Sequence, residues 1–551
     1  MKTRRPRAID QQMRPVRQRM SLEYPVDAPI GGWNTRDTID NMPPTDAVVM
    51  DNVIPGMGSV SQRPGYTEYT DSDDIDGHTP GAVETIMVLD DGDTEHVLAA
   101  DGGRIYRIDS GTAEVLPDSR DLDISNKSDR YDWVVFDGKI GMVNTYVATD
   151  WTEAEGPLTY EYTRPPTLPS GDLDWRVVSM GITGDDFPST PEGVLAKGQI
   201  VGINAFKNRT WFWKADCQDV WYSELYAMGG SLTKFPLSQV GNFSGSLLTM
   251  QTWTRDGGSG PDDFAVFIFS GGDAVIYSGS SPEVGGDWAL VGVYKIGELL
   301  SERSAVKFGP DLFLTTTLDY VNMSEVLSGA EAKTTRTKVS GALRDAVDVG
   351  YGFFGWEATV FPEARLIVFN VPTKSDGSEY VQHVLNYVTG AWCRFTDIVA
   401  HTWQSFKNEM YFGGDDGKVY KMARGLKTDN GEAIQVRFQP AWTMLEAPMR
   451  KTIIAHREMI RTSPSVNDST EYAIDFALFP NRAYPEAVDN EGTPWGSPWG
   501  SPWSTSDDNV QVEWRVVGTH GSVVGFEKRL SLKQSWEYLG HTWLYRPGER
   551  L

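Results

Sequence analysis

Residues 264–279, FAVFIFSGGDAVIYSG, decide the fold class of this chain. An apolar run ends at Phe269, a turn with Gly271 and Gly272 follows, and a second apolar run begins at Ala274. A Gly-Gly pair between two apolar runs of strand length predicts a tight β-hairpin, because glycine adopts the positive φ angles that such turns require. The stretch therefore favours an all-β protein.

The same pattern of strand, turn and strand recurs along residues 83–425. The turns lie roughly 35–70 residues apart, and most contain Asp-Gly or Gly-Gly. This spacing is in the range of β-propeller blades, which are small antiparallel sheets that bury their faces against neighbouring blades. Seven hairpins predict a propeller of six to eight blades, and a pair of β-sandwich domains is the alternative. Besides 264–279, the hairpins are expected at 97–108, 133–144, 201–213, 312–323, 365–388 and 410–422.

The C-terminal region, residues 426–551, is expected to form a separate β-sandwich or platform domain. It contains longer alternating stretches, such as those that begin at Tyr472 and Val510. Residues 21–82 are expected to join this domain as an N-terminal segment.

Few other local signals stand out. Gly31 and Gly32 indicate a close backbone approach. The stretch from Thr45 to Asn52 predicts a short helix, and residues 341–350 predict another.

The charge and the cysteine content argue against several classes of protein. The formal net charge is −26. Proteins that grip DNA phosphates need Lys and Arg, so an acidic body fits a surface past which DNA slides, or one that serves solubility. Cys217 and Cys393 belong to no CxxC or Cys/His cluster, so neither a disulfide framework nor a zinc site is expected. No apolar run reaches the ~18 residues of a membrane span, and the N-terminus lacks the apolar stretch of a secretory signal.

Two segments are candidate contact sites. Residues 1–20 form a basic N-terminal arm, which is either an assembly arm that orders on a neighbouring protein or a tail without a role. Residues 493–505, TPWGSPWGSPWST, either contact a partner protein or stack on their own domain. The basic residues of the arm are Lys2, Arg4, Arg5, Arg7, Arg14, Arg17 and Arg19, and the three tryptophans are Trp495, Trp499 and Trp503.

Motifs for catalysis or metal binding are not found in the sequence. The seven histidines form no HExxH, and there is no GxSxG elbow, Walker loop or GxGxxG after a strand. The acids that precede Gly77 are similar to a calcium loop, but Val83 stands where the bidentate Glu belongs. The sequence therefore predicts a protein that is not an enzyme and binds neither cofactor nor metal.

Several stretches together resemble the tail nozzle or hub (tail tubular) proteins of short-tailed, podovirus-type bacteriophages. The first contains GGWNTRD, beginning at Gly31, and NMPPTDAVVMDNVIPGMGSVSQRPGY, ending at Tyr66. The others lie further along the chain and contain no catalytic residue, namely 208–225, 252–279, 288–300, 389–395 and 410–420.

The resemblance implies a structural virion protein. Its subunits are expected to form a hexameric ring below the portal and the adaptor, the head-to-tail connector. The ring would retain packaged double-stranded DNA and conduct it during ejection without reading its sequence. Tail fibres or spikes are further expected partners. The location would be the virion tail, after synthesis in the cytoplasm of the host bacterium.

Two alternatives compete with this interpretation. One is a carbohydrate- or receptor-binding propeller, because tryptophan-rich loops can stack on the apolar faces of sugars. The other is a hydrolase, since a propeller can carry a site that no short motif reveals.

Overall fold

The fold is all-β in the part of the chain that the computed structural model describes. This part consists of residues 20–74, 79–90, 92, 95–109, 111–116, 129–149, 156–163, 174–256, 261–284, 287–327, 337–446, 449–462, 466–488 and 509–548. Its α-helices are short and lie at α1 (Pro191–Lys197), α2 (Met323–Leu327) and α3 (Ser340–Gly350). None of the helices in these ranges has the length and apolar character that crossing a membrane requires.

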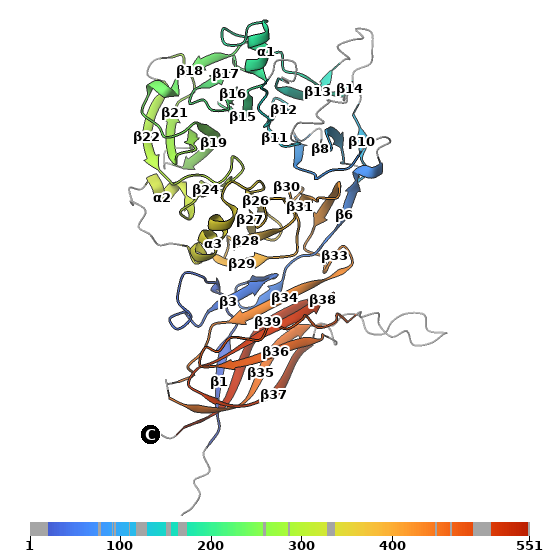
Figure 1. The fold of residues 1–551 in the computed structure, drawn as a ribbon, viewed down its shortest axis with the longest axis vertical. Coiled ribbons are helices and arrows are strands. Elements are labelled where there is room, and N and C mark those ends of the chain that lie inside the picture. The colour runs from blue at the N-terminus through green and yellow to red at the C-terminus, as the bar shows by residue number, and fades with distance from the viewer. Residues whose placement is uncertain are drawn as a thin grey trace, which may run out of the picture.

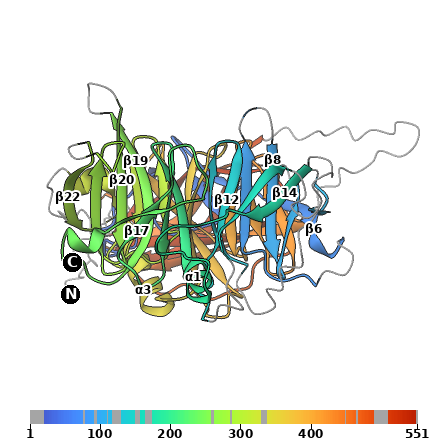
Figure 2. The same ribbon diagram turned by 90° about the horizontal axis from the view of Figure 1, so that it is seen from above.

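Seven small antiparallel sheets of the described residues succeed one another around a common centre (Figure 1). The first strand of each sheet contacts the first strand of the next, and β30 of the seventh contacts β7 of the first. The circle is therefore closed, and Figure 2 shows it from its edge. We call this part the ring of sheets.

The first four sheets of the ring have four strands each. They are β7 (Thr85–Asp90), β8 (Glu95–Asp101), β9 (Arg104–Arg107) and β10 (Glu114–Val115); β11 (Tyr131–Phe136), β12 (Lys139–Asn144), β13 (Leu158–Thr163) and β14 (Asp174–Ser179); β15 (Ile200–Phe206), β16 (Arg209–Lys214), β17 (Val220–Tyr222) and β18 (Thr233–Phe235); β19 (Leu247–Asp256), β20 (Pro261–Phe269), β21 (Asp273–Ser278) and β22 (Ala289–Lys295).

The last three sheets of the ring follow in chain order. They are β23 (Ala305–Phe308), β24 (Asp311–Thr315) and β25 (Tyr320–Asn322); β26 (Glu357–Phe361), β27 (Leu366–Pro372), β28 (Tyr380–Asn386) and β29 (Ala391–Phe395); β30 (Thr402–Phe406), β31 (Glu409–Gly413) and β32 (Lys418–Met422), with β6 (Tyr66–Asp71) added to β32.

All seven predicted hairpins are confirmed, and the one that decides the fold class shows why the sheets stack. Residues 265–269 of β20 are fully buried. Phe267 packs in a core with Trp211 of the third sheet, whereas Ile268 packs with Leu312 of the fifth. Successive side chains of a strand point to opposite faces, so both faces of this sheet are covered by neighbouring sheets.

A strand from the N-terminal segment completes the last sheet. β6 pairs antiparallel with β32 over Tyr66 to Asp71. The prediction placed all of residues 21–82 with the C-terminal domain, and it is wrong for this strand. The reason is that β32 would otherwise leave an unpaired edge, which β6 covers with backbone hydrogen bonds.

A β-sandwich lies beside the ring (Figure 1). One of its sheets contains β37 (Asn509–Gly521), β35 (Lys451–Thr462), β39 (Trp536–Pro547), β5 (Val60–Gln62) and β4 (Val53–Pro55), and β1 (Leu22–Asp27) pairs with β39. The facing strands are β3 (Asp46–Asp51), β34 (Glu432–Pro440), β38 (Val524–Leu532) and β36 (Asp468–Ile474). Both sheets of this sandwich therefore contain N-terminal as well as C-terminal strands.

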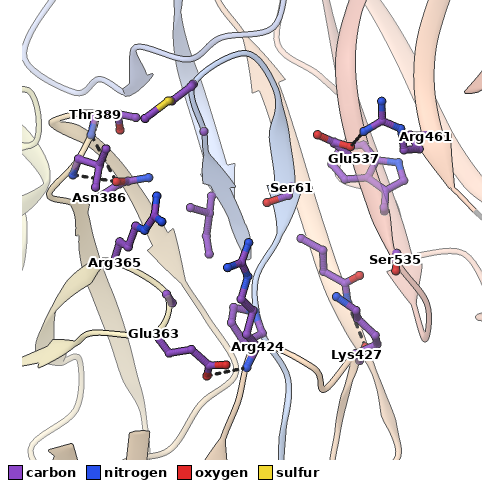
Figure 3. Close-up of a pocket in the computed structure, with 18 residues that line it drawn as sticks. Ser61, Glu363, Arg365, Asn386, Thr389, Arg424, Lys427, Arg461, Ser535 and Glu537 are labelled. Carbon is purple, nitrogen blue, oxygen red and sulfur yellow. Dashed lines mark hydrogen bonds and ion pairs between the residues drawn. The ribbon is translucent and has the colours of Figure 1, made fainter. Parts of the chain in front are cut away.

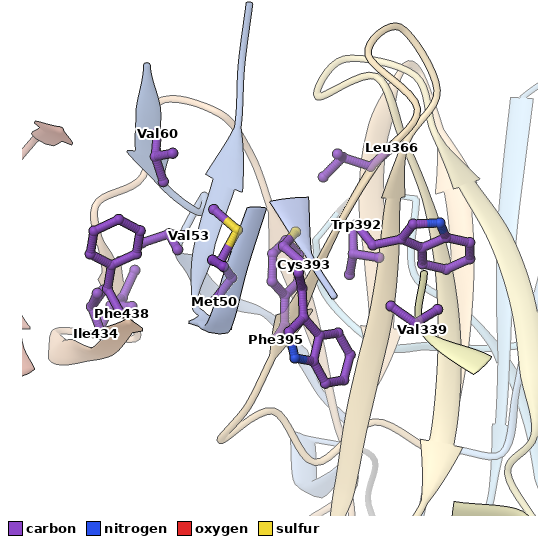
Figure 4. Packing of buried hydrophobic residues seen from close by; sticks show 14 of the residues in the cluster. Met50, Val53, Val60, Val339, Leu366, Trp392, Cys393, Phe395, Ile434 and Phe438 are labelled. Atoms are coloured by element: carbon purple, nitrogen blue, oxygen red, sulfur yellow. The ribbon is translucent and has the colours of Figure 1, made fainter. Parts of the chain in front are cut away.

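One apolar core runs from the sandwich into the ring (Figure 4). Met50 and Phe438 of the sandwich belong to the same cluster as Trp392 and Phe395 of the sixth sheet. Strand pairing is also continuous, because β2 (Gly32–Trp33) lies parallel to both β29 and β3, and β33 (Thr428–Asp429) pairs with both β34 and β6. The ring and the sandwich are therefore joined by shared sheets and a shared core.

Of the local structures predicted from the sequence, two are confirmed and one is wrong. The close approach at Gly32 is confirmed, because its φ is +86° and an added Cβ would lie 2.6 Å from the carbonyl oxygen of Trp392. The helix predicted between Thr45 and Asn52 is wrong, because that segment is strand β3 and pairs with β34. Tertiary pairing overrides a weak local preference there. The helix predicted at 341–350 is confirmed as α3.

Candidate functional site

A cleft of about 400 Å³ lies where the ring of sheets meets the sandwich (Figure 3). We call it the junction cleft. Turns of the sixth and seventh sheets form one wall, and the ends of β35 and β39 form the other. Strands β4 and β5 pass between them. Its lining includes Gln62, Glu363, Arg365, Arg424, Lys427, Arg461, Trp536 and Glu537.

Three basic side chains of the junction cleft lack a counter-ion. Within the described residues, Arg365, Arg424 and Lys427 form no ion pair and no side-chain hydrogen bond. Glu363 accepts a hydrogen bond from the backbone N–H of Arg424 at 3.2 Å, but forms no ion pair there. On the opposite wall Arg461 donates to Glu537 and so carries no free charge.

Next to the cleft, a buried ion pair joins two segments that run between the ring and the sandwich. Arg63 donates to both carboxylate oxygens of Asp429, at 2.8 and 2.6 Å, and to Asn52 Oδ1 at 2.8 Å. Gln62 Nε2 donates to the carbonyl oxygen of Lys427 at 3.0 Å. A bidentate Arg–carboxylate pair has a fixed geometry, so these bonds position Lys427 rigidly beside the cleft.

Two uncharged polar atoms of the cleft residues are also left without partners. Among the described residues, the buried indole N–H of Trp536 has no acceptor and the buried Gln62 Oε1 has no donor. Trp536 and Gln62 are only 2% and 8% exposed. Both residues line the junction cleft, but the two atoms themselves are covered by protein and are not open to a ligand.

The centre of the ring of sheets differs from the junction cleft, because its basic side chains have carboxylate or hydrogen-bond partners. Arg303 precedes β23 and donates to the carbonyl oxygens of Glu84 and Tyr131 at 2.9 and 2.7 Å. It also donates to the hydroxyls of Thr85 and Thr402, at 3.0 and 3.3 Å. These partners lie on or next to the first strands of the first, second and seventh sheets, so one guanidinium links three sheets.

Further ionisable groups surround Arg303. Arg130 donates to Glu302 at 2.9 Å, and a Glu357 oxygen lies 3.8 Å from Arg303 Nη1. Burial opposes ionisation of Glu302, yet the charges of Arg130 and Arg303 lower its pKa to about 2. Burial raises the pKa of Asp132 to about 7, even though its carboxylate accepts a 3.0 Å hydrogen bond from the N–H of Ile203.

The sandwich contains a second matched network. Lys528 donates to Glu458 and, at 2.7 Å, to Asp468. Arg515 donates to both oxygens of Asp468 at 2.6 Å. These residues lie on β35, β36, β37 and β38, so the network fastens the two sheets to each other. Its role is structural, because each carboxylate bonds to a cation of the same chain.

Metal binding has no visible basis in the described residues. No three His, Cys, Asp or Glu side chains gather there as ligands of one ion would. The buried histidines are held neutral, since burial lowers the pKa of His383 to about 3 and that of His456 to about 3.

The residues that the sequence singled out lie elsewhere. The basic residues of the N-terminal arm and Trp495, Trp499 and Trp503 fall outside the described residues. Sequence reasoning missed Arg365, Arg424 and Lys427, which are isolated basic residues in ordinary turns. The sequence offers only a weak signal there, the Pro-Glu-Ala that precedes Arg365; the structure adds that Arg365 has a φ of +60°, which is unusual for a residue with a side chain.

Comparisons with known proteins do not assign the chain to a family. No family model matches, and no curated protein matches. Among solved structures, the chain is similar to Raptor of Chaetomium thermophilum, with 8% identity and a TM-score of 0.36 over 66% of this chain. The matched part spans 30% of the Raptor chain. We infer no function from so distant a likeness.

Proposed function

We propose that this chain is a non-enzymatic structural protein of a short-tailed bacteriophage. It would be a subunit of the tail nozzle, a six-fold ring below the portal and adaptor that retains packaged DNA and conducts it during ejection. The ring of sheets would be a seven-bladed β-propeller, and the sandwich its platform. The stretches that resemble nozzle proteins support this, since 208–225 and 252–279 contain central strands of the third and fourth sheets.

The propeller interpretation is supported by closure and packing. Seven sheets follow one another in chain order, and the first and last are in contact. β6, from before the first sheet, completes the last one. Closing a propeller with a strand from the other end of its sequence ties the ends of the circle together.

The exposed face of β37 is the observation that best supports a protein that assembles with other subunits. This strand has 13 residues and forms the edge of its sheet. On one face it exposes Val510, Val512, Trp514 and Val516, which are 50%, 52%, 40% and 85% exposed. A long edge strand with an apolar face is a typical docking surface for another chain. We propose that a neighbouring subunit covers it.

The closed centre of the ring of sheets constrains where DNA could pass. Arg303 and its partners link the innermost strands, so a duplex would have to pass between copies of the chain. An overall charge of −26 would keep phosphates from adhering to such a passage.

The test is assembly on portal–adaptor complexes encoded by the same genome, followed by native mass measurement and imaging. We expect six copies of the 61.2 kDa chain to add beyond the adaptor. Replacing Val512 and Val516 by Lys should abolish the addition, whereas Val349→Lys, at a position 64% exposed on α3, should not. Another symmetry, or no binding to the adaptor, would contradict the proposal.

A further inference from the structure

The junction cleft has an unusual charge for this protein. The chain contains 76 acids and 50 basic residues. Three cations nevertheless line one cleft together, and the acid beside them, Glu363, bonds only to a backbone N–H. Like charges that share a space repel one another, and the repulsion is weakened when an anion binds. The contrast with the matched cations of the ring centre indicates that these three are kept free for a ligand.

The position of the cations indicates an extended ligand. Arg365 lies in the β26–β27 turn, Arg424 in the turn after β32, and Lys427 just before β33. Figure 3 shows them spread across the cleft and not gathered around one point. The volume of about 400 Å³ also exceeds the needs of a single small anion, since a water molecule takes roughly 30 Å³ of liquid. Several anionic groups on one backbone would meet all three cations.

The spacing of the cations favours a peptide. Carboxylate side chains along an extended peptide chain can meet basic residues that lie on three separate turns. A DNA duplex is too bulky to enter a cleft of about 400 Å³, so its phosphates would reach only the rim.

We propose that the junction cleft binds an acidic peptide segment of a partner protein. Carboxylates of the segment would pair with Arg365, Arg424 and Lys427. The Arg63–Asp429 pair and the bond from Gln62 to the carbonyl oxygen of Lys427 hold the backbone on this side of the cleft, so the backbone there needs little ordering on binding. The site goes beyond the proposed nozzle role, because it would bind such a segment in any assembly that contains this chain.

The test uses the full chain and a short peptide of alternating Glu and Ala with an uncharged fluorescent label. Its anisotropy is titrated at low ionic strength. The variant is Arg365→Gln/Arg424→Gln/Lys427→Gln. The matched control is Arg344→Gln/Lys374→Gln/Lys407→Gln, which removes the same charge from exposed cations that face surface acids. We expect saturable binding by the unchanged protein and the control, and a loss of at least about tenfold in the variant.

Three outcomes would overturn the proposal. They are no saturable binding by the unchanged protein, equal binding by the cleft variant, and complete displacement of the peptide by an equimolar amount of inorganic phosphate. The last would show a site for a small anion. Because the three cations are unpaired, the variant should keep its melting temperature. If it does not fold, the single charge reversal Arg424→Glu in an exposed turn gives the same readout. Failure of portal–adaptor assembly would leave these binding results unchanged, so the two proposals fail separately.

Discussion

The centre of the ring of sheets and the junction cleft contain the same kinds of charged side chain under opposite conditions. At the centre, Arg303 and Arg130 are enclosed and bond to carboxylates, carbonyl oxygens and hydroxyls of several sheets. In the cleft, Arg365 and Arg424 are exposed and form no ion pair within the described residues.

The comparison distinguishes two kinds of basic residue. Those at the centre of the ring stabilise the fold, whereas those in the junction cleft are available to a ligand. A buried cation whose partners are satisfied is costly to remove, since the partners are left unpaired. An exposed cation without a partner contributes little to stability. Substitutions at the two places should therefore have effects of very different size on the free energy of unfolding.

The largest effect is expected for Arg303→Met. The substitution keeps most of the side-chain volume but leaves the carbonyl oxygens of Glu84 and Tyr131 without their donor and removes the positive charge beside Glu357. We expect a loss of about 3–5 kcal/mol in the free energy of unfolding, measured by urea unfolding. Arg365→Met is the control and should change stability by less than about 0.5 kcal/mol. If the two variants lost similar amounts of unfolding free energy, the proposed difference between the ring centre and the junction cleft would be wrong.

A smaller effect, dependent on pH, is expected for Asp132→Asn. The pKa of Asp132 is raised from 3.8 to about 7 in the folded protein. Its contribution to stability is therefore complete below 3.8 and is lost as the pH rises through 7. Relative to the unchanged protein, the Asn variant should gain about 1–3 kcal/mol between pH 4 and pH 8. Parallel stability curves over this interval would show that the carboxyl ionises normally.

The smallest effect on stability is expected for the triple cleft variant, Arg365→Gln/Arg424→Gln/Lys427→Gln. Removing three unpaired cations ends their mutual repulsion and breaks no ion pair, so stability should stay within about 0.5 kcal/mol of the unchanged protein or rise slightly. Calorimetric melting at low and high salt measures it. A clear loss of stability would mean that these cations have structural partners.

The fold followed from the sequence where the signal was local. Turn chemistry such as Gly271-Gly272 depends on a few adjacent residues, so each hairpin was predictable. The pairing of β6 with β32 was not, because it joins segments about 350 residues apart and neither carries a mark of its partner. Strand β3 was mistaken for a helix for a related reason, since its long-range partner β34 decides its conformation.

The candidate site was still less predictable. Gln62, Arg365, Lys427 and Trp536 come together only when the ring and the sandwich are joined, and their neighbours in sequence are unremarkable as chemistry. Arg303 likewise stands in an ordinary Ser-Glu-Arg-Ser stretch, although it links three sheets. What the sequence could reveal was the overall excess of acid, against which three unmatched cations become significant.

Electron cryomicroscopy of the assembly that the proposed nozzle role requires, with DNA inside it, tests most directly whether matched charges close each ring of sheets. We predict side-chain density for Arg303 and Arg130 across the centre of every copy, with the duplex in a passage that the copies enclose between them. DNA density running through the centre of a single ring of sheets would contradict the account.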